Sequence, residues 1–303
     1  MNLIALLIGL FVERLATQLF HLRQLRWLDR VIDAGFRQAD RFRSWPALIP
    51  LTVLAILLVL PLAVVIVALG DTLYGFPYLI LAVVVLFFSL GPKDIGEQVH
   101  EYCKAVSADD PERIHKTARS LLEKDVPDDP RERSRQVEAA VCVQANNRLF
   151  AVIFWFVLLG PLGAWAYRVT DLIRRRAVFI ASRDDATEAV AADVAEAAGN
   201  LHAWLAWIPA RLTAFGYALA GSFDGAISAL RSNDRSKGAT TGERNEMLLA
   251  RAGLAALALS DEEGESASER GVRGAMAANG LVLRLLGIWA LAIALMTLSG
   301  LSL

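Results

Sequence analysis

Five side chains in this sequence are candidates for binding an anion within apolar surroundings: Arg211, Asn146, Asn147, Arg148 and Arg284. Arg211 lies near the middle of residues 204–223, which contain no other charged side chain. A charge inside an apolar segment of membrane length is costly, so such a residue marks a functional site by default. Two interpretations are open. Arg211 binds a ligand, or it pairs with a carboxylate or with backbone carbonyls to hold helices together.

Asn146, Asn147 and Arg148 directly precede the apolar run Leu149–Tyr167. Amides and a guanidinium at a membrane boundary are able to bind an anionic group. The alternative is a helix start whose arginine extends its head toward water. Arg284, near the start of the last apolar run, has the same alternative.

The remaining patterns favour neither catalysis nor a metal site. Glu97, His100, Glu101 and Cys103 could share one helical face and hold a metal ion, but no matching second pair of ligands follows. We also find no phosphate-binding glycine loop and no recognisable nucleophile motif. We therefore predict no catalytic residue, no metal and no cofactor, and we expect both cysteines to be free thiols.

Apolar runs must position the candidate residues. Hydrophobic residues make up 55% of the 303 residues, and the mean hydropathy is +0.42. Charge-free runs cover residues 47–70, 76–90, 149–167 and 285–303, and Arg211 alone interrupts residues 204–223. A helix needs about 20 apolar residues to cross a bilayer. We predict an all-α polytopic integral membrane protein, a single membrane domain over residues 1–303, with about four or five membrane segments, one of them re-entrant.

Basic residues predict the orientation of these segments. Residues 13–45 carry seven arginines, and their apolar residues recur at three- and four-residue steps, which is typical of a helix lying on the inner membrane surface. Residues 71–75 contain no Lys or Arg, so the positive-inside rule places residues 13–45 in the cytoplasm of a bacterial inner membrane. We expect residues 1–12 to form a buried or membrane-embedded helix that is not a cleaved signal peptide.

Polar helices make up a predicted cytoplasmic layer. Residues 93–147 are expected to be a helical insertion with helices at about 94–107, 111–124 and 130–147. Two of these begin at Asp110-Pro111 and Asp129-Pro130, each an N-cap followed by proline at the first helical position. Residues 170–280 are expected to mix amphipathic and re-entrant helices. They include a surface helix at 186–200, a helix at 243–259 and an acidic linker at 260–271, before a final span from about Gly280.

The run Leu149–Tyr167 poses a question of topology, because basic residues flank both of its ends and both ends therefore favour the cytoplasm. Gly160-Pro161 divides the run. We expect a broken, partly re-entrant helical hairpin whose freed backbone groups are covered by neighbouring protein. The alternative is a simple span.

The charge pattern limits the partners. A net charge of −1, with basic residues spread along amphipathic helices, excludes nucleic acid. The expected partners are the lipid bilayer and either a small anionic ligand or a membrane or cytoplasmic protein at the membrane face. The pattern is also compatible with a homo-oligomer.

Several strings resemble one membrane family. Phe11–Leu15 resembles the start of AmpE, the inner-membrane protein linked to β-lactamase induction. The block Arg148–Arg168 is similar to AmpE and to the CobD/CbiB cobinamide-phosphate synthases. Trp207–Ala214 is shared with both groups, and Gly274–Ala277 resembles a late segment of the cobalamin enzymes.

Departures from the synthases separate the two groups. The synthases carry an acidic Glu-Asn-x-x-Asp cluster where this chain has Val143–Arg148, which contains no carboxylate. Joining an amino alcohol to a corrinoid carboxylate with ATP needs acidic residues to hold metal and phosphates. The resemblance therefore implies an AmpE-like regulatory modulator on a CobD/CbiB-like scaffold, without synthase activity. The alternative is a cobamide-synthase-like enzyme that forms an amide on an amphiphilic substrate. A transporter is weaker, since no inverted repeat is visible.

Overall fold

The computed structural model describes residues 6, 26–41, 46–69, 76–90, 94–181, 188–231, 238–260 and 262–299. Every regular element within these ranges is helical, which confirms the all-α class. Three expected segments lie outside the described residues. They are the first helix at residues 1–12, apart from Leu6, the amphipathic segment before Arg26, and the 71–75 tip.

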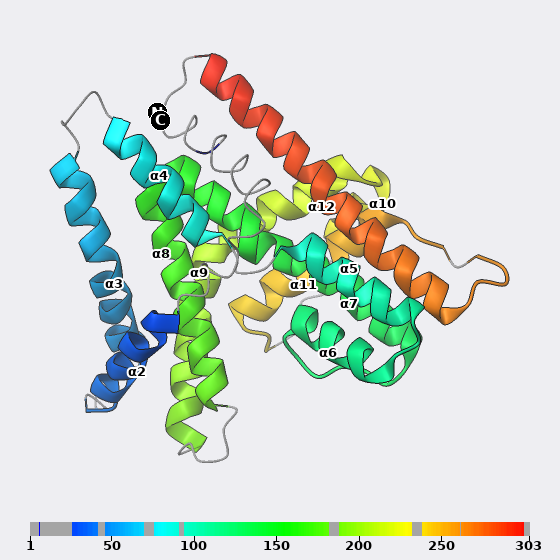
Figure 1. Cartoon of the computed structure of the whole chain (residues 1–303), viewed down its shortest axis with the longest axis horizontal. Coiled ribbons are helices and arrows are strands. Elements are labelled where there is room, and N and C mark those ends of the chain that lie inside the picture. Colours follow the sequence, from blue (N-terminus) through cyan, green and yellow to red (C-terminus); the bar gives the residue numbers. More distant parts are fainter. Residues whose placement is uncertain are drawn as a thin grey trace.

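The described helices follow one another in the order drawn in Figure 1. They are α2 (Arg26–Arg41), α3 (Leu48–Leu69), α4 (Phe76–Ser89), α5 (Ile95–Ser107), α6 (Pro111–Leu122), α7 (Pro130–Ala145), the π-helix η3 (Asn146–Phe150), α8 (Ala151–Ala181), α9 (Glu188–Ala220), α10 (Phe223–Arg231), α11 (Thr241–Leu257) and α12 (Ala267–Leu298).

Local capping chemistry starts the polar helices where the sequence predicts. The side chains of Asp94, Asp110 and Asp129 accept hydrogen bonds from backbone N–H groups in the first turns of α5, α6 and α7. Each cap satisfies a donor that the helix itself cannot pair. The three predicted helices between residues 94 and 147 are confirmed to within a few residues at their ends.

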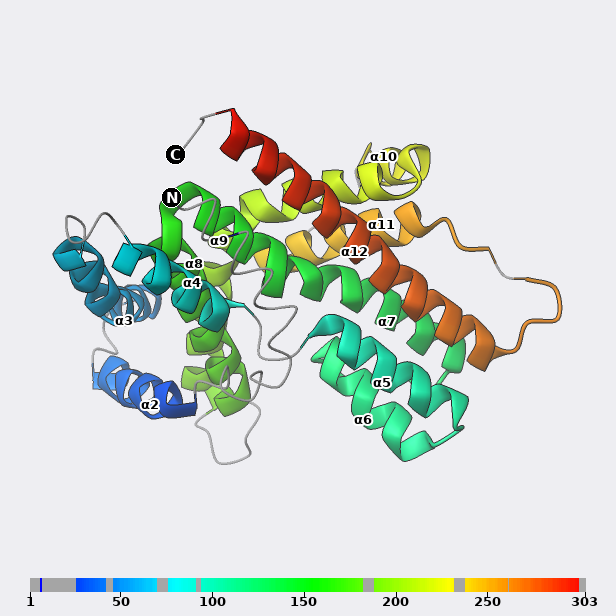
Figure 2. The same cartoon turned by 45° about the horizontal axis from the view of Figure 1, so that its top comes forward.

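Three apolar clusters hold the helices together. The first joins α5, α6 and α7 to α10, α11 and parts of α9 and α12. The second surrounds the start of α8 with α4 and the end of α12, and the third packs α2 and α3 against the end of α8. Helix α9 contributes Ala210 to the first, Ala206 to the second and Ala198 to the third, so its small residues let all three approach one central helix. In both views, α5 and α6 lie at the opposite end of the molecule from α2 and α3 (Figures 1 and 2).

Three helical stretches among the described residues are long and apolar enough to cross a membrane: Leu48–Ala68, Pro130–Ala181 and Ala267–Leu298. This number corrects the expected four or five. Helix α4 has only 14 residues, or roughly 21 Å, against a hydrocarbon core of about 30 Å. The segments expected separately at 186–200 and 204–223 form one helix, α9, whose first half is rich in alanine and acidic residues.

The start of the last helix also differs from expectation. Helix α12 begins at Ala267 with a capping box between Ser266 and Glu269, well before the expected start near Gly280. The last five of the twelve residues of the predicted acidic linker, 267–271, are therefore helical. Large apolar side chains are exposed along α3 from Ile49 to Val67 and at the end of α12. Soluble monomers rarely expose apolar faces this large, so these faces suit lipid.

Helix α8 is broken at Gly160, whose φ of 66° and ψ of −155° are not helical, and Pro161 follows. Arg148 and Arg175 both donate to the same oxygen of Glu123. In one straight helix these two arginines would be roughly 40 Å apart. The chain therefore turns back at the break, into a first limb before Gly160 and a second limb after it. The predicted break is confirmed, and a straight helix through residues 149–167 is wrong. Re-entry into the membrane stays a prediction.

Candidate functional site

Asn146, Asn147 and Arg148 lie together in the π-helix η3. Single π-helical turns inside α-helices occur frequently at functional sites. Asn146 is fully buried. Its side-chain oxygen accepts a hydrogen bond from the Thr213 hydroxyl at 3.0 Å, and its amide nitrogen donates to Asn147 Oδ1 at 3.1 Å. These bonds fix η3 against α9.

Arg148 points into the protein instead of toward water, so the interpretation of an outward-extending arginine is wrong. The residue is 6% exposed. Its Nε donates to Gln144 at 2.9 Å, its Nη1 to Gln98 at 2.6 Å and its Nη2 to Glu123 at 2.9 Å. All three nitrogens are engaged, so Arg148 organises the site and leaves ligand contact to its neighbours.

A partly buried ionic cluster lies beside η3. We call it the arginine cluster; it consists of Arg148, Arg168, Arg174, Arg175, Glu123 and Asp171. Asp171 is 1% exposed. It accepts hydrogen bonds from Arg168 at 2.8 Å, from Arg174 at 3.1 Å and from Arg175 at 2.9 and 3.0 Å. Four guanidiniums face two carboxylates, which leaves an excess of two positive charges.

Glu123 connects the two limbs of the hairpin. Its carboxylate accepts from Arg175 Nη1 at 2.6 Å and from Arg148 Nη2 at 2.9 Å. Burial raises the pKa of Glu123, but the charges of Arg175, Arg148 and Arg174 outweigh burial, so its pKa is lowered. The residue caps α6 in the left-handed conformation, with φ 55°, where glycine is usual. Glu123 adopts this conformation although its Cβ disfavours it.

The arginine cluster was not predicted from the sequence. Arg174, Arg175 and Arg176 were interpreted only as a basic flank of a membrane segment. The spacing of Arg168, Asp171, Arg174 and Arg175 at three and four residues places them on one helical face, and this spacing was the available signal. Arg148, from η3, and Glu123, the C-cap of α6, could not have been assigned to them by spacing.

Four donors in this region are buried without a hydrogen-bond partner among the described residues: Arg168 Nε, Arg174 Nε, Arg175 Nη2 and His202 Nδ1. An unpaired buried donor forfeits its bonds to water, so such groups are few in folded proteins. A local group of them indicates a place where an acceptor belongs.

A cavity of about 280 Å³ opens between α8, α9 and α11, and two of these four residues, Arg174 and His202, line it. Its buried wall is formed by His202 and Asn245, with Arg174 and Asn147 next to them. The more accessible lining includes Lys124, Glu196, Asn200, Thr240, Glu243 and Glu246. The cavity therefore brings one predicted residue, Asn147, together with side chains that the sequence did not single out.

Arg211 reaches this site indirectly. Its guanidinium stacks over Trp207, with 3.8 Å from Cζ to the ring centroid. It donates to the Trp207 carbonyl at 2.8 Å and to Asn245 Oδ1 at 3.1 Å, and Asn245 lines the cavity. Arg211 thus holds a backbone carbonyl and a cavity residue at once. Arg284 lies exposed on α12, away from the cavity lining.

Pro209 explains how α9 contacts α8. Proline has no N–H, so the carbonyl four residues earlier, at Leu205, loses its helical donor. The indole of Trp155 donates to this carbonyl at 3.0 Å. The freed backbone group thereby joins the first limb of α8 to the helix that carries Arg211.

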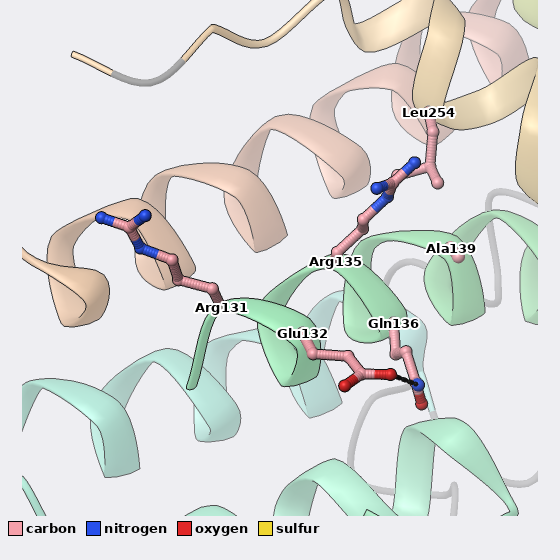
Figure 3. A pocket seen from close by; sticks show the side chains of 6 residues that line it. All are labelled: Arg131, Glu132, Arg135, Gln136, Ala139 and Leu254. Atoms are coloured by element: carbon pink, nitrogen blue, oxygen red, sulfur yellow. Dashed lines mark hydrogen bonds between the residues drawn. The ribbon is translucent and has the colours of Figure 1, made fainter. Parts of the chain in front are cut away.

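A second hollow, of about 530 Å³, lies on the outside of α7 (Figure 3). Arg131 and Arg135 project from α7 on one side. Glu132 and Gln136 point the other way and are joined by a hydrogen bond of 3.2 Å. Arg131 and Arg135 are exposed, so this hollow is open to solvent and has no polar group held inside it.

We expect His202 to make the protein less stable as the pH falls. Burial and the charge of Arg174 lower the pKa of His202 to about 3, against about 6.5 in an unfolded chain. Asp171, Arg175 and Glu123 are the other charged groups that act on it. The unfolded state binds the proton first, so stability is full above pH 6.5 and falls by up to about 1.4 kcal/mol per pH unit below it, until the folded pKa is reached.

This pH dependence is measurable as the tryptophan-fluorescence melting temperature of the detergent-solubilised protein between pH 5 and 8. The variant His202→Gln should melt at a temperature that changes less over this range. If wild type and variant lose stability in parallel, His202 is not the responsible group.

Comparison with known protein families gives one match over nearly the whole chain. The family model described as "Regulatory signalling modulator protein AmpE" matches residues 1–297. No curated protein and no solved structure gives a significant match. The matched residues include η3, the arginine cluster and the cavity.

Proposed function

The chain belongs to the AmpE family of regulatory signalling modulator proteins, and from this membership we propose how it acts. The protein is a regulatory modulator, and three helical stretches among its described residues are long and apolar enough to cross a membrane. We propose that it resides in the bacterial inner membrane and modulates β-lactamase induction. It would do so by binding a small anionic ligand or a protein partner at the cytoplasmic membrane face.

The arginine cluster carries this proposal. It ties the end of α6, through Glu123, to η3 and to the second limb of α8. The latter two belong to one of the three candidate spans. A ligand or partner that changes the contacts of the cluster would therefore act on a membrane segment and on the polar helices together. Coupling of this kind requires a physical connection between two elements, which the cluster supplies.

The proposed orientation rests on the basic residues. Arg148, Arg174 and Arg175 meet at Glu123, so the basic ends of the two limbs lie on one side of the hairpin. Arg176 of α8 forms a two-bond ion pair with Asp33 of α2, each bond 2.6 Å long, so the helix expected on the inner surface joins the same side. The positive-inside rule assigns this side, with residues 93–147 and 170–280, to the cytoplasm.

Kinship with the CobD/CbiB scaffold remains part of the proposal and rests on the sequence strings alone. No observation on the described residues favours the cobamide-synthase alternative. The proposed partners stay the bilayer, a small anion or a protein, with a homo-oligomer as a further arrangement.

Deletion of the gene should change the β-lactamase induction profile, and expression of the wild-type chain should restore it. Arg211→Ala should fail to restore induction while keeping its expression and melting temperature. Arg211 is exposed, and its contacts among the described residues are the Trp207 ring and carbonyl and the Asn245 side chain. The exposed Arg131→Ala is the matched control and should complement. An unchanged induction profile after deletion would contradict the proposal, and loss of folding in Arg211→Ala would assign that residue a structural role.

A further inference from the structure

We infer that the cavity between α8, α9 and α11 binds a single small anionic group, a phosphate or a carboxylate, with Arg174 and His202 as its main donors. This inference deepens the proposed function by naming the chemical class of the ligand. It rests on that function only for its biological meaning. The binding itself is a property of the cavity.

Charge favours an anion at this place. The arginine cluster forms one side of the site and has two positive charges more than its carboxylates neutralise. Arg174 is its member that lines the cavity, and its side chain is 18% exposed. Nη2 of Arg174 donates to Asp171, while Nε of Arg174 has no partner among the described residues. In a desolvated site a charge-assisted bond to an anion is stronger than a neutral one.

His202 supplies a second donor. It is 5% exposed, lines the cavity and has no partner for Nδ1 among the described residues. Its Nε2 lies 3.4 Å from the Tyr167 hydroxyl. With the phenol donating to Nε2, the neutral imidazole carries its proton on Nδ1 and offers an N–H. A neutral imidazole can donate this hydrogen bond without a negative group nearby to balance a charge on the ring.

Amide groups complete a polar lining. Asn147, Asn200 and Asn245 come from η3, α9 and α11, so three separate elements converge on the space. Asn245 is held in place by its bonds to the Ala203 carbonyl at 3.0 Å and to Arg211 at 3.1 Å. Arg211 and Asn147, both singled out in the sequence, therefore support the site as a positioning residue and a lining residue.

The acidic residues at the rim do not oppose an anion strongly. Glu246 is paired with Lys124 at 2.8 Å. Glu243 accepts hydrogen bonds from the backbone N–H and the hydroxyl of Thr240, the N-cap of α11. Glu196 is exposed at the rim. Of the three carboxylates at the rim, one is ion-paired, one is hydrogen-bonded in a helix cap and one is exposed to solvent. The residues with unpaired donors, Arg174 and His202, belong to the inner wall.

The volume limits the size of the ligand. A cavity of about 280 Å³ lies just below the roughly 300–1,000 Å³ of pockets that enclose drug-sized ligands, so it suits a phosphate or carboxylate with a few additional atoms.

The test uses the purified full-length chain in a neutral detergent. Inorganic phosphate is titrated against chloride at constant ionic strength, and the melting temperature is followed by tryptophan fluorescence. We expect a saturable rise with phosphate, because a ligand bound only by the folded state stabilises it. Arg174→Gln should weaken the apparent affinity by about 10-fold or more, since it removes a charged donor.

A second variant protects the test against misfolding of the first. Gly199 lines the cavity, and a Cβ added there would meet nothing within 4 Å. Gly199→Leu should therefore fold, block the cavity and abolish the phosphate effect. The exposed Arg131→Gln is the matched control and should bind phosphate as wild type does. A phosphate response equal in all four proteins would overturn the inference, and so would a wild-type protein that neither inorganic phosphate nor phosphatidic acid stabilises.

Two further arms identify the source of the anionic group. The protein is placed in nanodiscs of phosphatidylcholine with or without phosphatidic acid. If the stabilisation that Gly199→Leu abolishes comes from phosphatidic acid and not from inorganic phosphate, the ligand is a lipid headgroup; the opposite result indicates a soluble anion. Binding without any effect of deletion on induction would refute the proposed function alone, and an induction effect without binding would refute the anion site alone.

Discussion

Asp171→Asn is expected to destabilise the protein by about 3–5 kcal/mol, because it removes one partner of a buried ion cluster and leaves the other charges uncompensated. Asp171 is 1% exposed and accepts four hydrogen bonds from three guanidiniums. Glu123 would then be the one carboxylate left in the cluster for four arginines. The loss is measurable as a lower melting temperature and a smaller folded fraction in detergent.

Asp33→Asn is the matched control for this prediction. Asp33 also pairs with an arginine of α8, Arg176, but the two side chains are 25% and 23% exposed. Pairs near the surface contribute about 1 kcal/mol or less. If the two variants lose equal stability, the arginine cluster does not have the central role assigned to it.

A double variant separates charge compensation from simple damage. Arg168 is also buried, and its only hydrogen bond among those described goes to Asp171. Removing both charges in Arg168→Gln with Asp171→Asn should therefore cost less than the sum of the two single changes. Strict additivity would indicate that the two residues do not depend on each other.

Gly163→Ala is expected to disrupt the hairpin of α8 and to lower stability by about 3 kcal/mol, at the upper end of the usual cost of overpacking. A Cβ at Gly163 would overlap the backbone carbonyl oxygen of Trp155. Backbone cannot move aside as a flexible side chain does, so the two limbs would have to separate. Their separation would pull Arg175 away from Glu123 and weaken the arginine cluster as well.

The nearby Gly160→Ala should also destabilise, because φ of 66° with ψ of −155° is accessible almost only to glycine. Gly280→Ala on α12 is the control. No atom lies within 4 Å of an added Cβ there, and alanine is the better helix former by about 1 kcal/mol. It should leave the melting temperature unchanged or raise it. Equal effects at Gly163 and Gly280 would show that the close approach of the limbs is not needed.

The sequence predicted what depends on neighbouring residues along the chain. The N-caps at Asp110 and Asp129, the polar helices that they begin and the break at Gly160-Pro161 are confirmed. Cys103 and Cys142 are free, as expected. Capping, proline geometry and glycine's access to positive φ depend on residues close together along the chain. The sequence alone is therefore enough to predict these features.

Which apolar residues of α9 face protein could not be read from local composition. Residues 204–223 look like a span in isolation, but they continue a helix that starts at Glu188 and packs its small residues against three cores. Apolar residues that face protein and apolar residues that face lipid are indistinguishable by composition. Only the packing of α9 separates them.

The functional residues divide in the same way. The sequence alone determined the family, the helical class, the membrane-type apolar runs and the polar character of Asn146, Asn147 and Arg148. Tertiary structure decided that Arg148 is enclosed, that Arg211 supports the site through Asn245, and that Arg284 lies apart. It also decided where the unpaired donors meet, because Arg174 and His202 come from separate helices, α8 and α9. Their positions follow from the turn at Gly160 and from side-chain burial, which depend on contacts between distant parts of the chain.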